Sequence, residues 1–76
     1  MTRAAPVLLY RRAGCPYSAA ARAALLARGA VVREIDLDER PEALPELLKL
    51  TGGRRIVPVI VDGGSIAIAP EGGSPF

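Results

Sequence analysis

The stretch GCPYSAAAR, residues 14–22, places the chain's single cysteine between a glycine and a proline, just before an alanine-rich segment. Proline is favoured at the first position of a helix, so we expect a helix to begin at Pro16 and Cys15 to cap it. A thiol at that position lies at the positive end of the helix dipole, beside backbone N–H groups that have no intrahelical partner. Because both features favour the thiolate, the sequence predicts that Cys15 is a reactive thiol.

The residues around Cys15 favour a reactive thiol over a structural one. Arg11 and Arg12 precede it and add positive charge, which lowers a cysteine pKa. Ser18 follows about one helical turn later, where its hydroxyl is expected to donate a hydrogen bond to the thiolate. A lone cysteine is more often a small buried residue. The glycine, the proline and the two arginines instead predict an exposed thiol in electropositive surroundings.

Length and composition limit the class of protein. Seventy-six residues are expected to form a single domain over 1–76, with residues 70–76 as a coil tail. One cysteine excludes an internal disulfide and is typical of a reducing compartment, and no segment resembles a signal peptide or a membrane span, so we expect a cytoplasmic protein. The net charge of +2 comes without an arginine-lined helix or an aromatic platform, so neither nucleic acid nor a membrane is expected as a partner. The chain has no histidine, and no metal site or tightly bound cofactor is expected.

Hydrophobic patterning predicts the order strand, helix, strand, helix, strand, strand. The expected elements are strands at 6–10 and 30–37, helices at 16–28 and 41–50, and a hairpin of strands 57–61 and 65–69 around an Asp-Gly-Gly turn. The first strand–helix–strand unit should place its two strands parallel, and the hairpin adds an antiparallel edge. We therefore expect an α/β fold around a four-stranded mixed sheet. The core face of the first helix is expected to consist of Tyr17, Ala21, Ala24 and Leu25.

Pro58 lies between two valines in the apolar run 57–61, where a proline would remove a hydrogen bond from a sheet. Two interpretations fit the sequence equally well. In the first, the Val57–Pro58 bond is cis, and the Val57 backbone faces a neighbouring loop rather than continuing the sheet. In the second, Pro58 is an ordinary trans proline on an edge strand.

The element order, the CPYS segment that opens the first helix and the IVPVIV segment at 56–61 together resemble the glutaredoxin branch of the thioredoxin fold. The resemblance covers about residues 7–69. It implies a thiol–disulfide oxidoreductase in which Cys15 attacks a mixed disulfide, with glutathione or another small thiol as co-substrate.

The same resemblance implies roles for residues that would bind the substrate. Tyr17 would line the groove of the small thiol, Val57 would pair through its backbone with the bound cysteinyl group, and Pro58 would be the family's cis proline. Basic residues on both sides of the site would meet the substrate's carboxylates. The candidates are Arg11 or Arg12 on one side and Arg54 or Arg55 on the other.

The sequence departs from the family pattern at three places. Ser18 replaces the second cysteine of a dithiol site, so a monothiol route remains, in which a second small thiol releases the group bound to Cys15. The family's Gly-Gly-Asp segment, which binds glutathione, has only Gly72 and Gly73 as a displaced counterpart, which leaves the identity of the small thiol open. The family's final helix is missing, so one apolar face should be poorly covered, which favours a homodimer. The ending also resembles a bacterial group of glutaredoxin-like proteins in which selenocysteine can replace the nucleophilic cysteine.

Two other functions remain as alternatives. Monothiol relatives bind a [2Fe–2S] cluster between two protomers, each of which contributes one cysteine. Such carriers usually have glycine and phenylalanine where this chain has Pro16 and Tyr17. A non-catalytic binding module on the same fold is the second alternative, favoured by the missing glycine–aspartate segment and the missing helix. The surroundings of Cys15 favour a monothiol oxidoreductase that acts on protein or small-molecule mixed disulfides.

Overall fold

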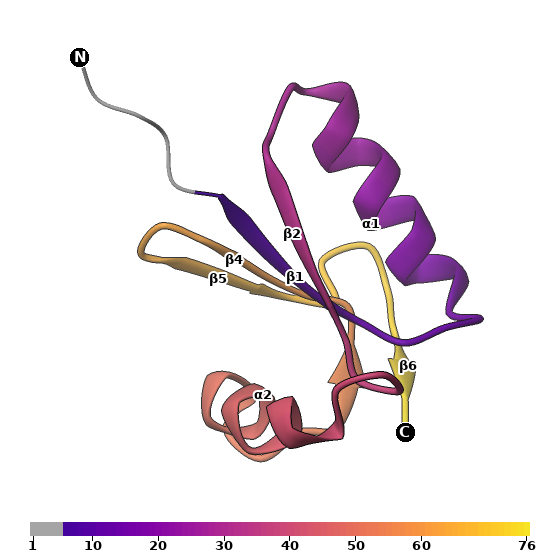
Figure 1. The fold of residues 1–76 in the computed structure, drawn as a ribbon, viewed down its shortest axis with the longest axis vertical. Helices are drawn as coiled ribbons and strands as arrows, with labels where there is room; N and C mark the ends of the chain where they lie inside the picture. Colours follow the sequence, from indigo (N-terminus) through magenta and orange to yellow (C-terminus); the bar gives the residue numbers. More distant parts are fainter. Residues whose placement is uncertain (1–5) are drawn as a thin grey trace.

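The computed structural model describes residues 6–76, and its elements follow the predicted order (Figure 1). The first half contains strand β1 (Val7–Arg11), helix α1 (Pro16–Ala27), strand β2 (Val32–Asp36), the 3-10 turn η1 (Pro41–Ala43) and helix α2 (Leu44–Thr51). The second half contains only strands: β3 (Ile56–Val57), β4 (Val59–Asp62), β5 (Ser65–Ile68) and β6 (Ser74–Pro75).

The main sheet has four strands in the order β2–β1–β4–β5. β1 pairs parallel with β2, from Val7 opposite Val32 to Arg11 opposite Asp36, and antiparallel with β4. β4 and β5 form the predicted antiparallel hairpin. This mixed four-stranded sheet with two helices is the thioredoxin-like arrangement that the sequence predicts.

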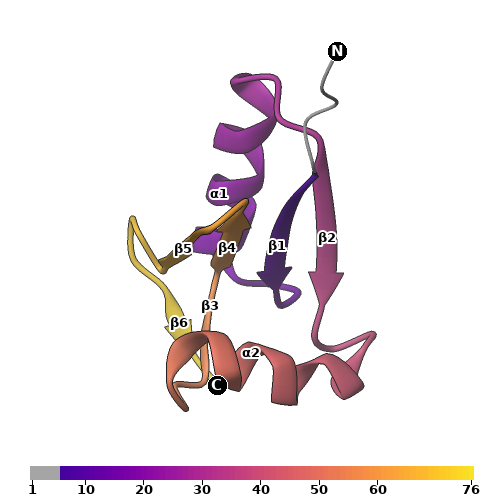
Figure 2. The same ribbon diagram turned by 90° about the vertical axis from the view of Figure 1, so that its left-hand side faces the viewer.

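β1 is buried on both faces because its successive side chains point to opposite sides of the sheet. Val7 and Leu9 pack with Leu25 of α1, whereas Tyr10 packs with Leu47 of α2. The two helices therefore cover opposite faces of β1. Figure 2 shows α1 beside the strands and α2 across their lower end.

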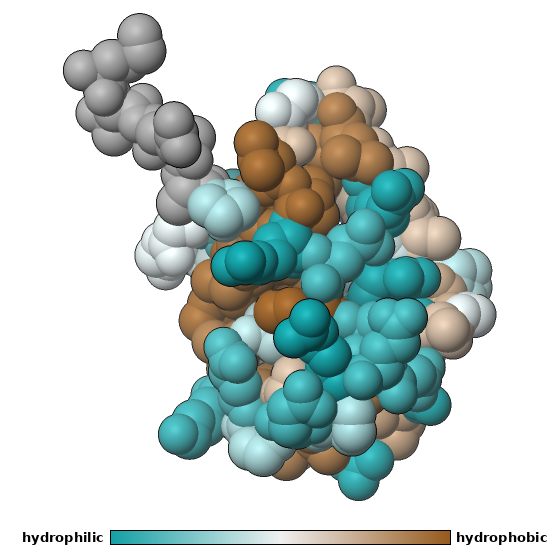
Figure 3. Space-filling view, viewed as in Figure 1, coloured by the Kyte–Doolittle hydropathy of each residue, from teal (hydrophilic) through white to brown (hydrophobic). Residues whose placement is uncertain are grey.

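The outer edge of the sheet at β2 carries charged side chains. Arg22 Nε lies 2.8 Å from Glu34, and Arg11 lies 3.6 Å from Glu34 and 3.7 Å from Asp36. Figure 3 shows hydrophilic side chains across the middle of the face that β2 presents. Charges on an edge strand discourage pairing with another chain, so this edge of the sheet is protected.

α1 contacts the sheet through fewer residues than its pattern predicts. Leu25 is buried and Ala21 half-buried, but Tyr17 and Ala24 are exposed, so the prediction that these two face the core is wrong. Both instead line a groove of about 210 Å³ between α1 and residues 70–72. Residues 70–72 pass along this side of α1 without covering these two side chains. Self-association through the groove stays a prediction.

The second half of the chain contains a cis proline and a short strand near its end. The Val57–Pro58 bond is cis, which confirms the first of the two interpretations. The expected coil at 70–76 is wrong in part: most of these residues lie outside helices and strands, but Ser74–Pro75 forms β6 and pairs antiparallel with β3 in a second, two-stranded sheet. The glycine- and proline-rich composition of the tail gives no sign of this pairing, because its partner strand is distant in the sequence.

Leu25 and Leu26 are neighbours in α1 that differ in exposure, 5% against 45%. Leu25→Ala removes buried side-chain volume beside β1, so the free energy of unfolding should fall by about 2–4 kcal/mol. Leu26→Ala makes the same chemical change on the solvent side and should lower it by less than about 1 kcal/mol. Urea unfolding of both variants measures the difference, and equal losses would contradict this packing of α1.

Candidate active site

Cys15 lies between the end of β1 and the first turn of α1. Its backbone is extended (φ −84°, ψ 113°), Pro16 is the first helical residue, and the Ala19 N–H donates to the Cys15 carbonyl at 3.2 Å. Cys15 is therefore the N-cap, as predicted. The first turn of α1 has no acidic side chain, so no carboxylate of that turn opposes a negative charge on the sulfur.

The Cys15 side chain is buried, with only 7% of its surface exposed. The prediction of an exposed thiol is wrong because the tail covers it. Ser74 and Pro75 line a cavity of about 170 Å³ together with Cys15, Arg12 and Val57. Ser74 Oγ lies 3.4 Å from Cys15 Sγ. The thiol thus faces a small cavity rather than open solvent.

Hydrogen bonds decide the protonation of this buried thiol. Burial by itself raises the pKa of Cys15, because it removes water from the charged form. The hydroxyls of Ser18 and Ser74 and the backbone N–H groups of Ser18 and Tyr17 act in the opposite direction, and the net pKa is lowered. Ser18 is fully buried and its hydroxyl has no hydrogen-bond partner in the structure. A Cys15 thiolate would accept a hydrogen bond from this hydroxyl, which explains why Ser18 lowers the pKa. Ser74 is a second hydroxyl at the sulfur, and the sequence analysis missed it.

The two arginines before Cys15 have different surroundings. Arg11 is paired with the acidic side chains of β2. Arg12 lines the cavity at Cys15 and is held by Asp38, whose Oδ1 accepts from Arg12 Nε at 3.2 Å and from its NH2 group at 3.1 Å. Of the two predicted cations, Arg12 is the one that the structure brings to the thiol.

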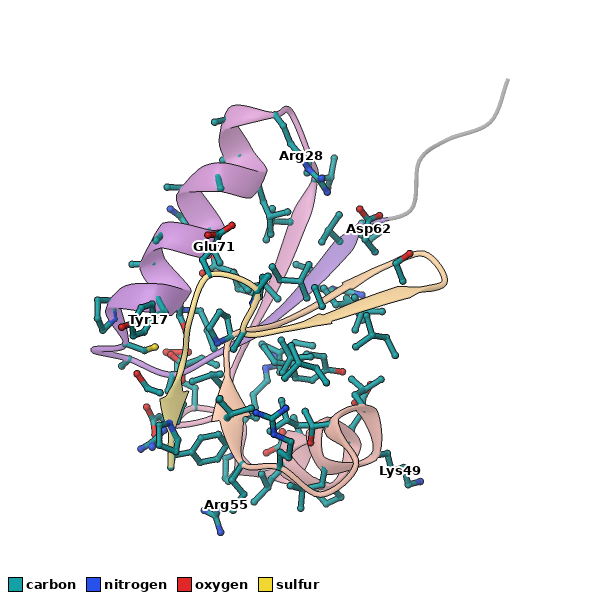
Figure 4. All side chains as sticks on the ribbon, turned by 180° about the vertical axis from the view of Figure 1, so that it is seen from behind. Tyr17, Arg28, Lys49, Arg55, Asp62 and Glu71 are labelled. Atoms are coloured by element: carbon teal, nitrogen blue, oxygen red, sulfur yellow. The ribbon has the colours of Figure 1, made fainter. Side chains whose placement is uncertain are left out.

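Arg55 rather than Arg54 lies at the site. Arg55 and Arg12 line a neighbouring cavity of about 180 Å³. Their guanidinium groups lie over the ring of Phe76, at 5.2 Å and 5.0 Å from its centroid, which is within cation–π range. Arg54 is exposed, and its backbone N–H donates to Thr51 Oγ1 at 3.0 Å. Figure 4 shows Arg55 near the start of β3, well away from Lys49 on α2.

The remaining predicted residues lie at the same region. Val57 and Pro58 are buried, and Val57 packs in one cluster with Cys15. Tyr17 and Pro58 line the groove beside α1, and the Tyr17 ring lies against the backbone of Gly72. Cys15, Arg12 and Val57 thus line one cavity, whereas Tyr17 and Pro58 line the separate groove beside α1.

The site at Cys15 can carry out the reactions of a single activated thiol. A stabilised thiolate is a nucleophile toward disulfides, and no second cysteine is available to resolve the product. Among residues 6–76, no group of three or more histidine, cysteine or acidic side chains is arranged to hold a metal ion. In the same part of the chain, no helix is long and apolar enough to cross a membrane.

The family model for glutaredoxin matches residues 7–66, most of the chain. The chain belongs to the glutaredoxin family. Glutaredoxins are thiol–disulfide oxidoreductases that in general use glutathione as co-substrate. A search of curated proteins and a search of solved structures found no match. The matched range contains Cys15, Ser18 and Val57 and ends before β6, so the tail of this glutaredoxin lies outside it.

In this glutaredoxin, Ser18→Ala and Ser74→Ala should each raise the pKa of Cys15. Each change removes a hydroxyl donor, and a hydrogen bond to a charged group contributes about 1.5–3 kcal/mol, which corresponds to roughly one to two pKa units. The pH dependence of Cys15 alkylation by iodoacetamide measures the shift, because only the thiolate reacts. Ser65→Ala, in the exposed hairpin, is the control and should leave the pKa unchanged. Both active-site variants titrating like the wild type would contradict this account.

Proposed function

We propose that this protein is a monothiol glutaredoxin, which removes glutathione-type groups from protein or small-molecule mixed disulfides in a reducing compartment such as the cytoplasm. The observation that carries the proposal is the position of its single cysteine. Cys15 caps α1, and its sulfur has hydroxyl donors and Arg12 close by. With no second cysteine in the chain, a disulfide within one protein molecule is impossible.

The proposed reaction has two exchange steps. The Cys15 thiolate attacks the glutathione sulfur of a mixed disulfide, a new S–S bond forms, and the substrate's thiolate leaves and takes up a proton. A second glutathione thiolate then attacks the glutathione sulfur bound to Cys15, which releases glutathione disulfide and restores the Cys15 thiolate. The net change is transfer of the glutathionyl group from the substrate to a second glutathione. Ser18 assists the thiolate but cannot resolve the intermediate, because it has no thiol.

Three other residues have proposed roles in binding. The backbone of Val57, next to Pro58, is the edge to which the substrate's cysteinyl group adds as a short strand. Arg12 and Arg55 supply positive charge for the substrate's carboxylates. Arg12 is already paired with Asp38, so Arg55 should contribute more of this recognition.

Exposure to glutathione disulfide should add one glutathionyl group to the wild-type chain and none to Cys15→Ser. The reason is that Cys15 is the only residue able to form a disulfide. Intact-mass spectrometry measures the adduct, and excess reduced glutathione should then remove it. A chain that gains no adduct, or keeps its adduct in reduced glutathione, would contradict turnover by this route.

Carboxylate recognition can be isolated by comparing glutathione disulfide with its carboxyl-esterified form. The wild type should react with the charged form about tenfold faster or more, since a charged hydrogen bond contributes about 1.5–3 kcal/mol. Arg55→Ala should lose most of this preference, while Lys49→Ala, which removes an exposed cation from α2, should keep it. The ratio of the two rate constants is the readout, because it cancels changes in thiol reactivity. A ratio that Arg55→Ala leaves intact would remove Arg55 from the proposed site.

A further inference from the structure

The tail of the chain lies where the proposed substrate strand would bind. β6 pairs antiparallel with β3, and Ser74 is the residue opposite Val57. One residue beyond β6, the Phe76 N–H donates to the Arg55 carbonyl at 3.0 Å. The Val57 edge, which the proposed function assigns to the substrate's cysteinyl group, is therefore already paired with the protein's own backbone.

Ser74 occupies the position of a substrate cysteine in this pairing. Serine and cysteine side chains differ only in the replacement of oxygen by sulfur, and Ser74 Oγ lies 3.4 Å from Cys15 Sγ. A sulfur atom on the same Cβ would be within reach of the Cys15 thiolate. The tail thus places a side chain shaped like cysteine beside the Cys15 thiol, but its hydroxyl oxygen cannot take part in disulfide exchange.

The Phe76 ring packs against the two arginines that would bind the substrate's carboxylates. It contacts the guanidinium groups of both Arg12 and Arg55, at 5.0 Å and 5.2 Å. The strand edge, the nucleophile and the cationic pair are therefore all engaged by residues 74–76. Chance packing of a coil is not expected to engage all three features at once.

Two glycines let the tail reach this position. A Cβ at Gly72 (φ +112°) would lie 2.8 Å from the Tyr17 ring, and one at Gly73 would lie 2.6 Å from the Val57 carbonyl oxygen and 2.7 Å from Ala69 Cβ. Side chains are therefore excluded from both positions by the path of the tail. Figure 4 shows the loop that carries Glu71 passing along α1 near Tyr17 before it turns into β6.

The tail is held by few interactions. β3 and β6 contribute two residues each, and one of them is Pro75, which is exposed and has no N–H to donate. A two-stranded pair of this length is not stable by itself. A longer substrate strand can therefore compete with the tail for the same edge.

We propose that residues 74–76 are a built-in substitute for the substrate, which covers Cys15 in the resting protein and is displaced by an extended, cysteine-containing segment of a mixed disulfide. The inference rests on the proposed function for the assignment of the site. It also describes the preferred substrate. The segment runs antiparallel to β3, places its cysteine at the position of Ser74, and has an aromatic or acidic side chain two residues later, where Arg12 and Arg55 meet it.

Ser74→Cys tests the position of the tail without any need for glutathione recognition. Diamide, a two-electron thiol oxidant, takes two electrons and two protons from the introduced thiol and Cys15, becomes the hydrazine, and leaves an S–S bond within the chain. Closure is measured by mass spectrometry after iodoacetamide has been added to quench free thiols. Ser65→Cys, with its thiol on the exposed hairpin, is the control.

The tail holds the introduced thiol next to Cys15, so Ser74→Cys should close at least about tenfold faster than Ser65→Cys. Equal rates in the two variants would overturn the inference. Rapid closure in Ser74→Cys, combined with a wild type that does not react with glutathionylated peptide, would contradict the proposed function while keeping the tail at the thiol.

Gly73→Ala tests whether the tail limits access to Cys15. The added methyl group should push the tail from the Val57 edge without changing any residue that touches substrate. The second-order rate constant for reaction with a low concentration of glutathionylated peptide, measured at pH values where Cys15 is fully ionised, should rise about fivefold, because the state that can bind substrate is no longer a minor fraction. The pKa of Cys15 should shift in the same variant, because the burial that the tail causes and the Ser74 hydrogen bond are lost together and act in opposite directions.

Gly64→Ala is the matched control, because a Cβ at Gly64 meets no atom within 4 Å, and it should change neither quantity. A second-order rate constant that stays the same or falls in Gly73→Ala would overturn the inference and would mean that the tail is a fixed part of the site. If Gly73→Ala does not fold, the closure rate of Ser74→Cys decides.

Discussion

A sulfur atom with 7% of its residue exposed can carry a negative charge only if hydrogen bonds replace the water that it has lost. At Cys15 the replacement comes from the start of α1 and from the tail. Backbone N–H groups and the Ser18 hydroxyl belong to the helix, and the Ser74 hydroxyl belongs to β6. The position of the cysteine at the helix cap, the absence of acidic residues from the first turn and the packing of β6 on β3 all serve this one requirement.

The tail has two opposing effects on this thiol. Ser74 helps to ionise the sulfur, while the segment that carries Ser74 covers it and occupies the edge of Val57. Under the proposed function, a resting site of this kind would hold a thiolate ready and expose little of it to other oxidants. Its reactivity toward a particular disulfide then depends on how well that disulfide competes for the β3 edge and for Arg12 and Arg55. Selectivity would arise from this competition rather than from the thiol alone.

Sequence patterns predicted those features that depend on interactions between residues close together in the chain. The apolar run of β1, the Asp-Gly-Gly hairpin and the proline after Cys15 gave the order of elements, the mixed sheet and the helix cap. Ser74 and Phe76 could not be found in this way. Ser74 is 59 residues from Cys15, and its segment pairs through two residues with a strand that is just as short, so no periodicity marks it. The glycine pair was noticed, but its reason is a close approach to Tyr17 and Val57 that only the fold reveals. The exposure of Tyr17 and Ala24 was missed because helical spacing gives the direction of a side chain but not whether another element lies there to cover it.

The most direct test of this account is an ultraviolet absorbance titration of the Cys15 thiolate in the wild-type protein, with Cys15→Ser as the blank that removes the tyrosine contribution. The account predicts a midpoint clearly below the free-thiol value of about 8.5, because hydroxyl and backbone donors outweigh burial. A midpoint at or above that value would mean that burial dominates, and Cys15 would then be a structural thiol under a fixed tail.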